Sequence, residues 1–414
     1  MKIFKTAFAN LLLRGASLGS RFVLLFVLGK FLDAEAVGMY GLILAYITYA
    51  IYALGFEYYN YSTRELIIQN PENRFSLLMS QMVFFGVVYA VVLPLLSFIF
   101  VGNLLPWKYA LWFYGILIFE HLSHEVNRAL IAISEPFMAT LILFIKTGAW
   151  AIILSVLLIL FPAFRTLEIL LLFWLSGVAL ATAWGAFVIV SKCHPTGMSR
   201  VSWAWIIKGI KVAFPLLIAS LSLRGMYSLD KIFMEKVAGL AVLGAYTLFS
   251  SVSNAVIAFI DAGLIVFYYP KIILAATKNN NISGTVNDLF MRVLLFSIFL
   301  VAGGMVVTFI ALPYLGKAVY IDYFYMLVWQ MGSAFLYCLG VVPQLGLYGM
   351  GKDMDILLSH LLSLVVFIIA FLILKPYVGV YSVLLSQCMG FAVMVILKCA
   401  FNLKAKSSLV MSEL

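Results

Sequence analysis

The chain has 414 residues, of which 65% are hydrophobic and 11% charged, and its mean hydropathy is +1.10. Soluble globular proteins carry about 45–50% apolar and about 25% charged residues, so this composition excludes a soluble fold and indicates a protein that is solvated largely by lipid. The formal net charge of +10 does not point to nucleic acid, because no basic surface domain with interleaved aromatic residues is left to bind it. The four cysteines have neither metal-ligand spacing nor the pattern of a disulfide framework.

Twelve apolar stretches follow one another along the chain, and each is long enough to cross a bilayer as a helix of about 20 residues. The first lacks a small-x-small cleavage site, which favours an uncleaved transmembrane helix over a signal peptide. Turn-forming pairs such as Asn70-Pro71, Glu135-Pro136 and His194-Pro195 separate the stretches. The segment 263–288 either extends the eighth helix or forms a short interfacial piece. We predict an all-α integral membrane protein with helices over residues 8–32, 37–59, 76–101, 109–133, 137–161, 168–191, 206–228, 240–262, 289–314, 322–349, 355–374 and 378–401.

The distribution of basic residues predicts the orientation in the membrane. With the N-terminus inside, sixteen of the 27 Lys and Arg fall in cytoplasmic loops or helix ends, seven fall outside and four lie within spans. This bias predicts that both termini are cytoplasmic in a multi-pass protein of the cell inner membrane. Lys398 belongs to the cytoplasmic set, near the end of the last span. Asp230 and Lys231 are expected to form a solvated pair at the outer end of the seventh helix.

A parallel internal repeat is indicated when the second half of the sequence is shifted back by 206 residues. The matches fall at the start of the second helix of each half, where Gly38 aligns with Gly244 and Tyr40 with Tyr246, flanked by Lys30 with Lys236 and Leu42 with Leu248. The repeat predicts two six-helix lobes, residues 1–204 and 205–414. Two such lobes suggest a central cavity and alternating access.

Several cationic side chains lie where lipid would be expected. An Arg or Lys at the bilayer centre costs about 2.5–3.5 kcal/mol on insertion scales, so such residues usually face a protein interior or a wet cavity. Arg21 and Arg224 lie deep in the first and seventh helices, and we expect both to line a cavity. Arg14 lies closer to the cytoplasmic side and could instead reach the headgroups. Lys146, on the fifth helix, fits either setting.

The fourth helix carries the densest group of titratable residues. Glu120 and His124 share one face, where they either pair with each other or take part in ion coupling; with Asp261 they are the candidates for a proton or sodium gradient. His121 and His124 have the i, i+3 spacing that could hold a metal with Glu120 or Glu125, but two buried histidines among charged neighbours more often form a hydrogen-bonded network. We predict no metal and no cofactor. The sequence has no Walker motif and no hydrolase motif, which favours a transporter over an enzyme.

Two runs of the sequence resemble the polysaccharide flippase (Wzx-type O-antigen translocase) family of the multidrug/oligosaccharidyl-lipid/polysaccharide exporter superfamily. The first is Gly38-Met39-Tyr40-Gly41-Leu42, followed by Gly55-Phe56 and Thr63-Arg64-Glu65-Leu66, and the second extends from Lys211 through Ser228-Leu229-Asp230-Lys231-Ile232 to Thr247. The resemblance implies two MATE-like six-helix bundles around a cationic cavity. It also implies translocation of an undecaprenyl-pyrophosphate-linked oligosaccharide in O-antigen or lipopolysaccharide biosynthesis, with membrane lipid and other polysaccharide-assembly proteins as partners.

The charge pattern bears on the substrate but does not identify it. A guanidinium group offers a planar fork of donors that matches phosphate oxygens, although chloride or a substrate carboxylate would be equally compatible with the charge. A multidrug or cation antiporter of the same fold would need membrane-embedded carboxylates; Glu120 is one, but the deep charges are mostly basic. A membrane polymerase or ligase would need a sizeable periplasmic loop, and the outer loops are short.

Overall fold

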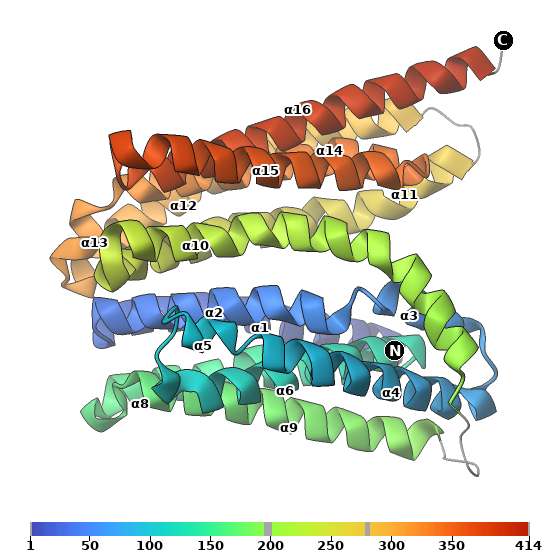
Figure 1. Cartoon of the computed structure of the whole chain (residues 1–414), viewed down its shortest axis with the longest axis horizontal. Helices are drawn as coiled ribbons and strands as arrows, with labels where there is room; N and C mark the ends of the chain where they lie inside the picture. The colour runs from blue at the N-terminus through green and yellow to red at the C-terminus, as the bar shows by residue number, and fades with distance from the viewer. Residues whose placement is uncertain (1, 194–200, 278–281, 413–414) are drawn as a thin grey trace. The chain divides into compact units, whose positions relative to one another are not determined.

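The computed structural model describes the backbone of residues 2–193, 201–277 and 282–412, and the chain in those ranges is helical apart from short connections (Figure 1). In lipid, a backbone N–H or C=O without a partner costs several kcal/mol, and a helix satisfies these groups within one segment. Long apolar runs therefore become helices whatever their individual residue preferences. The predicted all-α membrane fold is confirmed.

Sixteen α-helices occur in the described ranges. Two of their connections are π-helical turns, Ile145–Ala149 between α7 and α8 and Asp261–Ile265 between α10 and α11. The helices are α1 Lys2–Phe31, α2 Ala34–Gly55, α3 Tyr59–Ile68, α4 Pro71–Leu95, α5 Phe98–Val101, α6 Ala110–Ala132, α7 Pro136–Phe144, α8 Trp150–Leu160, α9 Leu167–Cys193, α10 Trp203–Ile260, α11 Val266–Thr277, α12 Ile282–Leu315, α13 Ala318–Asp322, α14 Tyr325–Gly349, α15 Asp353–Val378 and α16 Tyr381–Ser412.

The long helix α10 consists of two helices that meet at Gly239. This glycine has φ 79° and ψ 177°, a conformation outside the helical region. The Tyr246 hydroxyl donates a hydrogen bond of 2.8 Å to Asp230 Oδ2, although residues 16 positions apart in a straight helix would be about 24 Å apart. The chain therefore turns back at Gly239, as the predicted break between the seventh and eighth helices requires. The eighth helix then continues through the π-helical turn into α11, so the segment after residue 263 extends it as far as Thr277.

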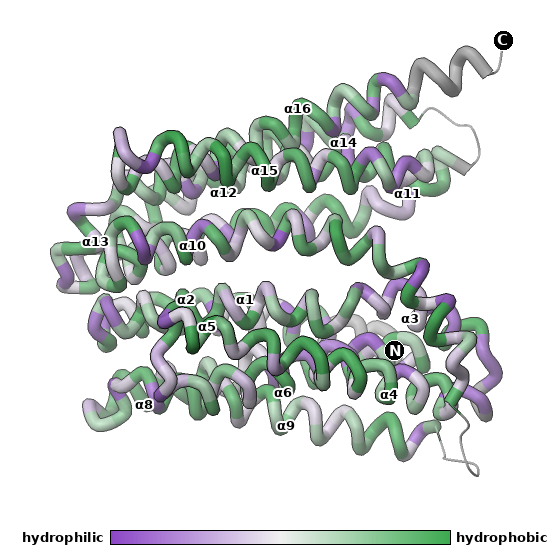
Figure 2. The backbone as a smooth tube through the Cα atoms, in the orientation of Figure 1, coloured by the Kyte–Doolittle hydropathy of each residue, from purple (hydrophilic) through white to green (hydrophobic). Residues whose placement is uncertain are grey.

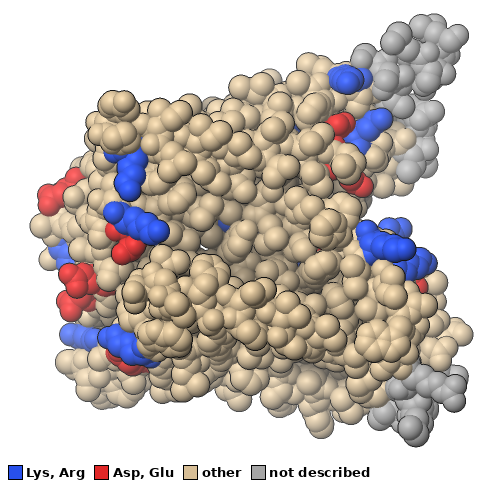
Figure 3. All heavy atoms as spheres, in the orientation of Figure 1, with Lys and Arg blue, Asp and Glu red and all other residues tan. Residues whose placement is uncertain are grey.

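The spans are consistent with a multi-pass membrane protein. Ten segments within the described residues are long and apolar enough to cross a membrane, and one of them, Trp203–Ala276, contains the break at Gly239 and counts as two. We assign α6 as a further span, since it has 23 residues and its charged side chains face the interior of the protein. This brings the number to the predicted twelve. Hydrophilic residues and charged side chains gather toward the helix ends (Figures 2 and 3).

The chain forms two compact units. Unit 1 comprises Met1–Leu32 and Ile43–Leu217, and unit 2 comprises Asp33–Leu42 and Ile218–Leu414. The beginning of α2 therefore belongs to unit 2 and its remainder to unit 1, and α10 is likewise shared. The division into lobes at residue 204 stays a prediction.

The glycines of the predicted repeat meet within unit 2. A Cβ atom added to Gly38 would lie 2.0 Å from the carbonyl oxygen of Leu240, and one added to Gly244 would lie 2.1 Å from the carbonyl oxygen of Ala34. The shift of 206 residues relates Ala34 to Leu240 and Gly38 to Gly244, so the contact is reciprocal, as a pseudo-two-fold arrangement of repeats produces. Glycine is required at both positions because the two backbones approach too closely for a side chain.

Candidate functional site: a polar cavity in unit 1

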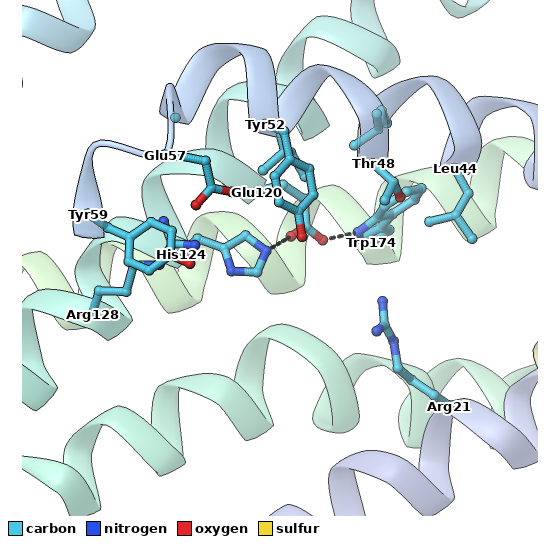
Figure 4. A pocket seen from close by; sticks show the side chains of 13 residues that line it. Arg21, Leu44, Thr48, Tyr52, Glu57, Tyr59, Glu120, His124, Arg128 and Trp174 are labelled. Carbon is cyan, nitrogen blue, oxygen red and sulfur yellow. Dashed lines mark hydrogen bonds and ion pairs between the residues drawn. The ribbon is translucent and has the colours of Figure 1, made fainter. Parts of the chain in front are cut away.

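Unit 1 contains a polar cavity with a volume of about 180 Å³ (Figure 4). Its walls come from α1, α2, α6 and α9, from the first residue of α3, and from the residues that connect α2 to α3. Charged and aromatic side chains dominate the lining, in contrast to the apolar exterior of these helices. The lining residues are Arg21, Leu44, Ile47, Thr48, Ile51, Tyr52, Gly55, Glu57, Tyr59, Glu120, His124, Arg128 and Trp174.

Glu120 on α6 is the most extensively paired residue of this cavity. Its Oε2 atom lies 2.6 Å from Lys146 Nζ, and its Oε1 atom accepts a hydrogen bond of 2.7 Å from Trp174 Nε1. His124, one turn further along α6, places Nε2 3.9 Å from Oε2. Glu120 and Lys146 are only 5% and 4% exposed. An ionised group at this depth is tolerated only with partners of good geometry, and Glu120 has them.

Lys146 reaches Glu120 from a π-helical turn in the fifth span. This turn, Ile145–Ala149, interrupts the regular helix, and its Lys146 carbonyl accepts a hydrogen bond of 2.7 Å from Trp150 Nε1. Such turns are rare and frequently occur at functional sites. The lysine also donates to the backbone carbonyl of Glu120 at 3.3 Å. Lys146 is therefore a structural partner of Glu120 in this conformation and does not itself line the cavity.

Arg21 on α1 lines the same cavity as Glu120. In Figure 4 its guanidinium group points into the open space below Trp174 and Glu120. Within the part of the chain that the structure describes, no carboxylate lies within ion-pair distance of Arg21, and its side chain is exposed to the cavity. Arg21 thus lies in a cavity wall, which is the position that the sequence analysis expects for it. A guanidinium with unused donors can bind an anionic group that enters the space.

The far end of the cavity is formed by a break between α2 and α3. Phe56 and Glu57 both have positive φ values, 53° and 54°, a strained conformation for residues other than glycine. The break brings the Glu57 carboxylate into the cavity wall at 5% exposure, where it accepts a hydrogen bond of 2.7 Å from Asn60 Nδ2. Beside it, the Arg128 guanidinium stacks 3.5 Å from the centre of the Tyr59 ring. Burial, assisted by the negative charge of Glu57, raises the pKa of Tyr59 to about 12.

Sequence patterns did not identify Glu57 or Tyr59 as site residues. Gly55-Phe56 enters only through the family resemblance, and most of α3 falls between the predicted helices 37–59 and 76–101. The available signal was a carboxylate directly after an apolar span, followed by three tyrosines within the next four residues. This signal is weak because a charged residue after a span is also the ordinary pattern of a helix end.

The other histidine and glutamate of α6, His121 and Glu125, belong to a hydrogen-bonded network that does not line the cavity. Glu125 accepts hydrogen bonds from Gln81 Nε2 at 2.8 Å and from Arg128 Nη1 at 2.5 Å. His121 Nδ1 lies 2.5 Å from the Tyr89 hydroxyl. No cluster of three or more His, Cys, Asp or Glu side chains with metal-binding geometry occurs among the residues that the structure describes.

The remaining predicted site residues lie elsewhere. Arg14 is exposed on α1 and does not line this cavity. Arg224 and Asp261 belong to unit 2, where Arg224 is half-buried and lies within electrostatic range of both Asp261 and Tyr227. Asp261 is exposed and lies at the start of the second π-helical turn. The structure thus brings together Arg21, Glu120, His124 and Lys146 in unit 1, but not Arg14.

The expectation of a solvated pair at Asp230 and Lys231 is wrong. Asp230 is 1% exposed and Lys231 is 6% exposed. Asp230 Oδ2 accepts hydrogen bonds from the Tyr246 hydroxyl at 2.8 Å and from Gln387 Nε2 at 2.9 Å, while Lys231 Nζ donates to the Tyr227 carbonyl at 2.9 Å. The physical reason is the turn at Gly239. The helix continues for two turns beyond Asp230, and the returning helix covers it.

Comparisons with known proteins agree with this fold. No protein-family model and no curated protein matches the sequence. Among solved structures, the chain is similar to an inward-facing multidrug resistance MATE family transporter of the MOP superfamily, with a TM-score of 0.74, 14% identity and 96% coverage of both chains. It is also similar to the lipid II flippase MurJ in an inward closed conformation, with a TM-score of 0.73 and 12% identity over 95% of this chain and 87% of MurJ.

A third similar structure is a MOP superfamily transporter from Pyrococcus furiosus, with a TM-score of 0.52 and 13% identity over 98% of this chain and 92% of the other. At these identities the likeness concerns the fold alone. This protein is a multi-pass membrane protein with the fold shared by MATE transporters and MurJ.

Proposed function

We propose that the chain is a flippase that moves an undecaprenyl-pyrophosphate-linked oligosaccharide, an O-antigen or related surface-polysaccharide repeat unit, across the cytoplasmic membrane by alternating access. The observation that carries the proposal is Arg21, a guanidinium without a carboxylate partner that faces a polar cavity inside a membrane protein. Its planar donors suit the oxygens of a pyrophosphate. The sequence resemblance to polysaccharide flippases and the fold shared with a lipid II flippase support a lipid-linked substrate.

The remaining cavity wall suits sugars. Tyr52, Tyr59 and Trp174 present rings with polar tips, and Thr48 and Glu57 supply a hydroxyl and a carboxylate that can accept hydrogen bonds from sugar hydroxyls. In this proposal Arg21 anchors the pyrophosphate and the aromatic wall holds the adjoining sugars.

A multidrug or cation antiporter of the same fold is the second candidate. The observation in its favour is that two carboxylates, Glu57 and Glu120, line the cavity. Glu120 is already paired with Lys146, however, and proton or sodium exchange at this residue would first have to break that ion pair. In either case an ion gradient would act through titratable groups, of which Glu120, His124 and Asp261 are candidates.

Removal of the Arg21 guanidinium tests the flippase proposal. In a strain that lacks the chromosomal gene, plasmid-borne Arg21→Ala should fail to restore surface polysaccharide, and Arg21→Lys should restore part of it, because an ammonium keeps the charge without the fork. Arg292→Ala, which removes an exposed arginine paired with Asp288, is the control and should restore wild-type levels. Immunoblots of membrane fractions establish equal amounts of protein. Arg224→Ala examines unit 2 in the same way.

Two results would contradict the proposal. Wild-type polysaccharide with Arg21→Ala would exclude Arg21 as the anchor. Normal polysaccharide in the null strain, together with increased sensitivity across a panel of cationic drugs, would instead favour the antiporter. Accumulation of single, unpolymerised repeat units at the surface of the null strain would favour a polymerase.

A further inference from the structure

Lys398 is completely buried inside unit 2. The sequence places this residue among the cytoplasmic helix ends, but the structure shows it at 0% exposure on α16, within the candidate span Tyr381–Ala405. Its Nζ atom donates a hydrogen bond of 2.7 Å to Gln344 Oε1 on α14. The amide oxygen is a neutral acceptor. A lysine ammonium has three donors, so this single bond leaves the charged form poorly solvated.

The elements packed around Lys398 bring no acid to it. From α15, His360 is within electrostatic range of the amine; its Nδ1 lies 3.3 Å from the Ala219 carbonyl of α10 and its Nε2 is buried without a partner. From α16 itself come Cys399 and Asn402, and the Asn402 amide donates to the Pro343 carbonyl of α14. Among the residues that the structure describes, no carboxylate is within ion-pair distance of Lys398 Nζ.

The other buried lysines in the described ranges provide the comparison. Lys146 has Glu120 at 2.6 Å, and Lys231 has Asp230 at 3.5 Å. Each of these two lysines therefore has a carboxylate within 3.5 Å, whereas Lys398 has none among the described residues. Burial of an ammonium ion without a counter-charge carries a penalty that loss of the proton removes, and the neutral amine can still donate its bond to Gln344.

We propose that Lys398 is a proton-binding site of unit 2, which holds a neutral amine in the conformation described here and takes up a proton in a conformation that admits water or an anion to it. His360 acts in the same direction, since a positive charge on either group disfavours a charge on the other. Protonation would thus be linked to conformational change in unit 2. The site is separate from Glu120, His124 and Asp261, and it does not depend on the identity of the transported substrate.

The pH dependence of stability tests this site. If the folded protein holds Lys398 neutral, then below pH 10 the unfolded chain binds one more proton than the folded protein. Part of the wild-type melting temperature should therefore increase as pH rises. The full-length protein in detergent is melted between pH 6.5 and 9.5 as wild type, Lys398→Met and the exposed-lysine control Lys375→Met. Lys398→Met should exceed the wild type by several degrees at pH 6.5, with the difference shrinking as pH rises, whereas Lys375→Met should run parallel to the wild type.

A second variant keeps the proposal falsifiable if Lys398→Met does not fold. Gln344→Glu places a carboxylate opposite the amine, which allows the lysine to stay charged in the folded state and should remove the same pH-dependent component. In the Lys398→Met background, Gln344→Glu leaves an acid without a partner and should lower the melting temperature. Curves for wild type, Lys398→Met and Gln344→Glu that run parallel over the whole pH range would overturn the proposal. Because the readout is stability, failure of the flippase hypothesis would leave this result unaffected.

Discussion

Replacement of Lys146 by methionine should destabilise unit 1 strongly. Methionine has a similar length and no charge, so the change removes the ion pair of 2.6 Å to Glu120 and leaves the helix intact. Loss of one partner of a buried pair typically costs about 3–5 kcal/mol, because the other charge remains buried without compensation. Glu120 keeps the hydrogen bond from Trp174 and the neighbouring His124, so we expect a loss near the lower end, about 3 kcal/mol.

The measurement is reversible unfolding of the purified protein by SDS in mixed micelles, with Lys146→Met, Glu120→Gln and the double variant compared with the wild type. Glu120→Gln removes the acid but retains an oxygen that can accept from Trp174. The double variant buries no charge at this position, so it should be more stable than Lys146→Met alone, and the cycle should give a coupling energy of about 1–3 kcal/mol.

Glu120 lines a cavity, and water in that cavity would weaken its ion pair with Lys146. If water already screens the carboxylate, Lys146→Met would cost less than about 1 kcal/mol, as exposed ion pairs do. The two single changes would then add without coupling in the double variant. Either result would refute the assignment of Lys146 as an essential partner of Glu120.

The other two predictions concern packing in unit 2 and pH in unit 1. Gly38→Ala and Gly244→Ala should each destabilise unit 2 by roughly 1–3 kcal/mol, because each added Cβ would overlap a backbone carbonyl. In the same SDS titration the control Gly332→Ala, which has open space at its Cβ, should be neutral or slightly stabilising. Equal stabilities for all three variants would refute the close contact. Because the pKa of Tyr59 is raised to about 12, the contribution of its phenol to stability is complete below pH 10 and is lost as pH rises through 12. The wild type should therefore lose stability over that window more steeply than Tyr59→Phe, and tyrosinate absorbance at 295 nm should show one fewer high-pH titration in the variant. Identical alkaline profiles for the two proteins would exclude the buried phenol.

The close pairing of the two repeat glycines could be anticipated in part. A shift of 206 residues aligned Gly38 with Gly244, and both proved to lie where two backbones touch. The alignment does not by itself tell which residues meet. That pairing follows from reciprocal packing of one copy against the other, which a one-dimensional comparison does not contain.

Predictions for single ionisable residues were less dependable than those for helices. Asp230 and Lys398 both lie near predicted helix ends, where charged residues are normally solvated, and both are buried. Asp230 is covered because the chain turns back at Gly239, and Lys398 because α14 and α15 pack on its side of α16. Glu57 reached the cavity through a strained break that no apolar periodicity marks.

The membrane-spanning, all-helical character of this protein follows from its long apolar runs alone, because in lipid each run must satisfy its backbone hydrogen bonds locally. Which charges are paired depends instead on how the helices pack against one another. Glu120 finds Lys146 26 residues away and Trp174 54 residues away, while Lys398 finds Gln344 54 residues away and no acid. Helix packing brings these residues, which are distant in sequence, into contact. The free energy of a buried ion in a membrane protein depends on which groups that packing places beside it.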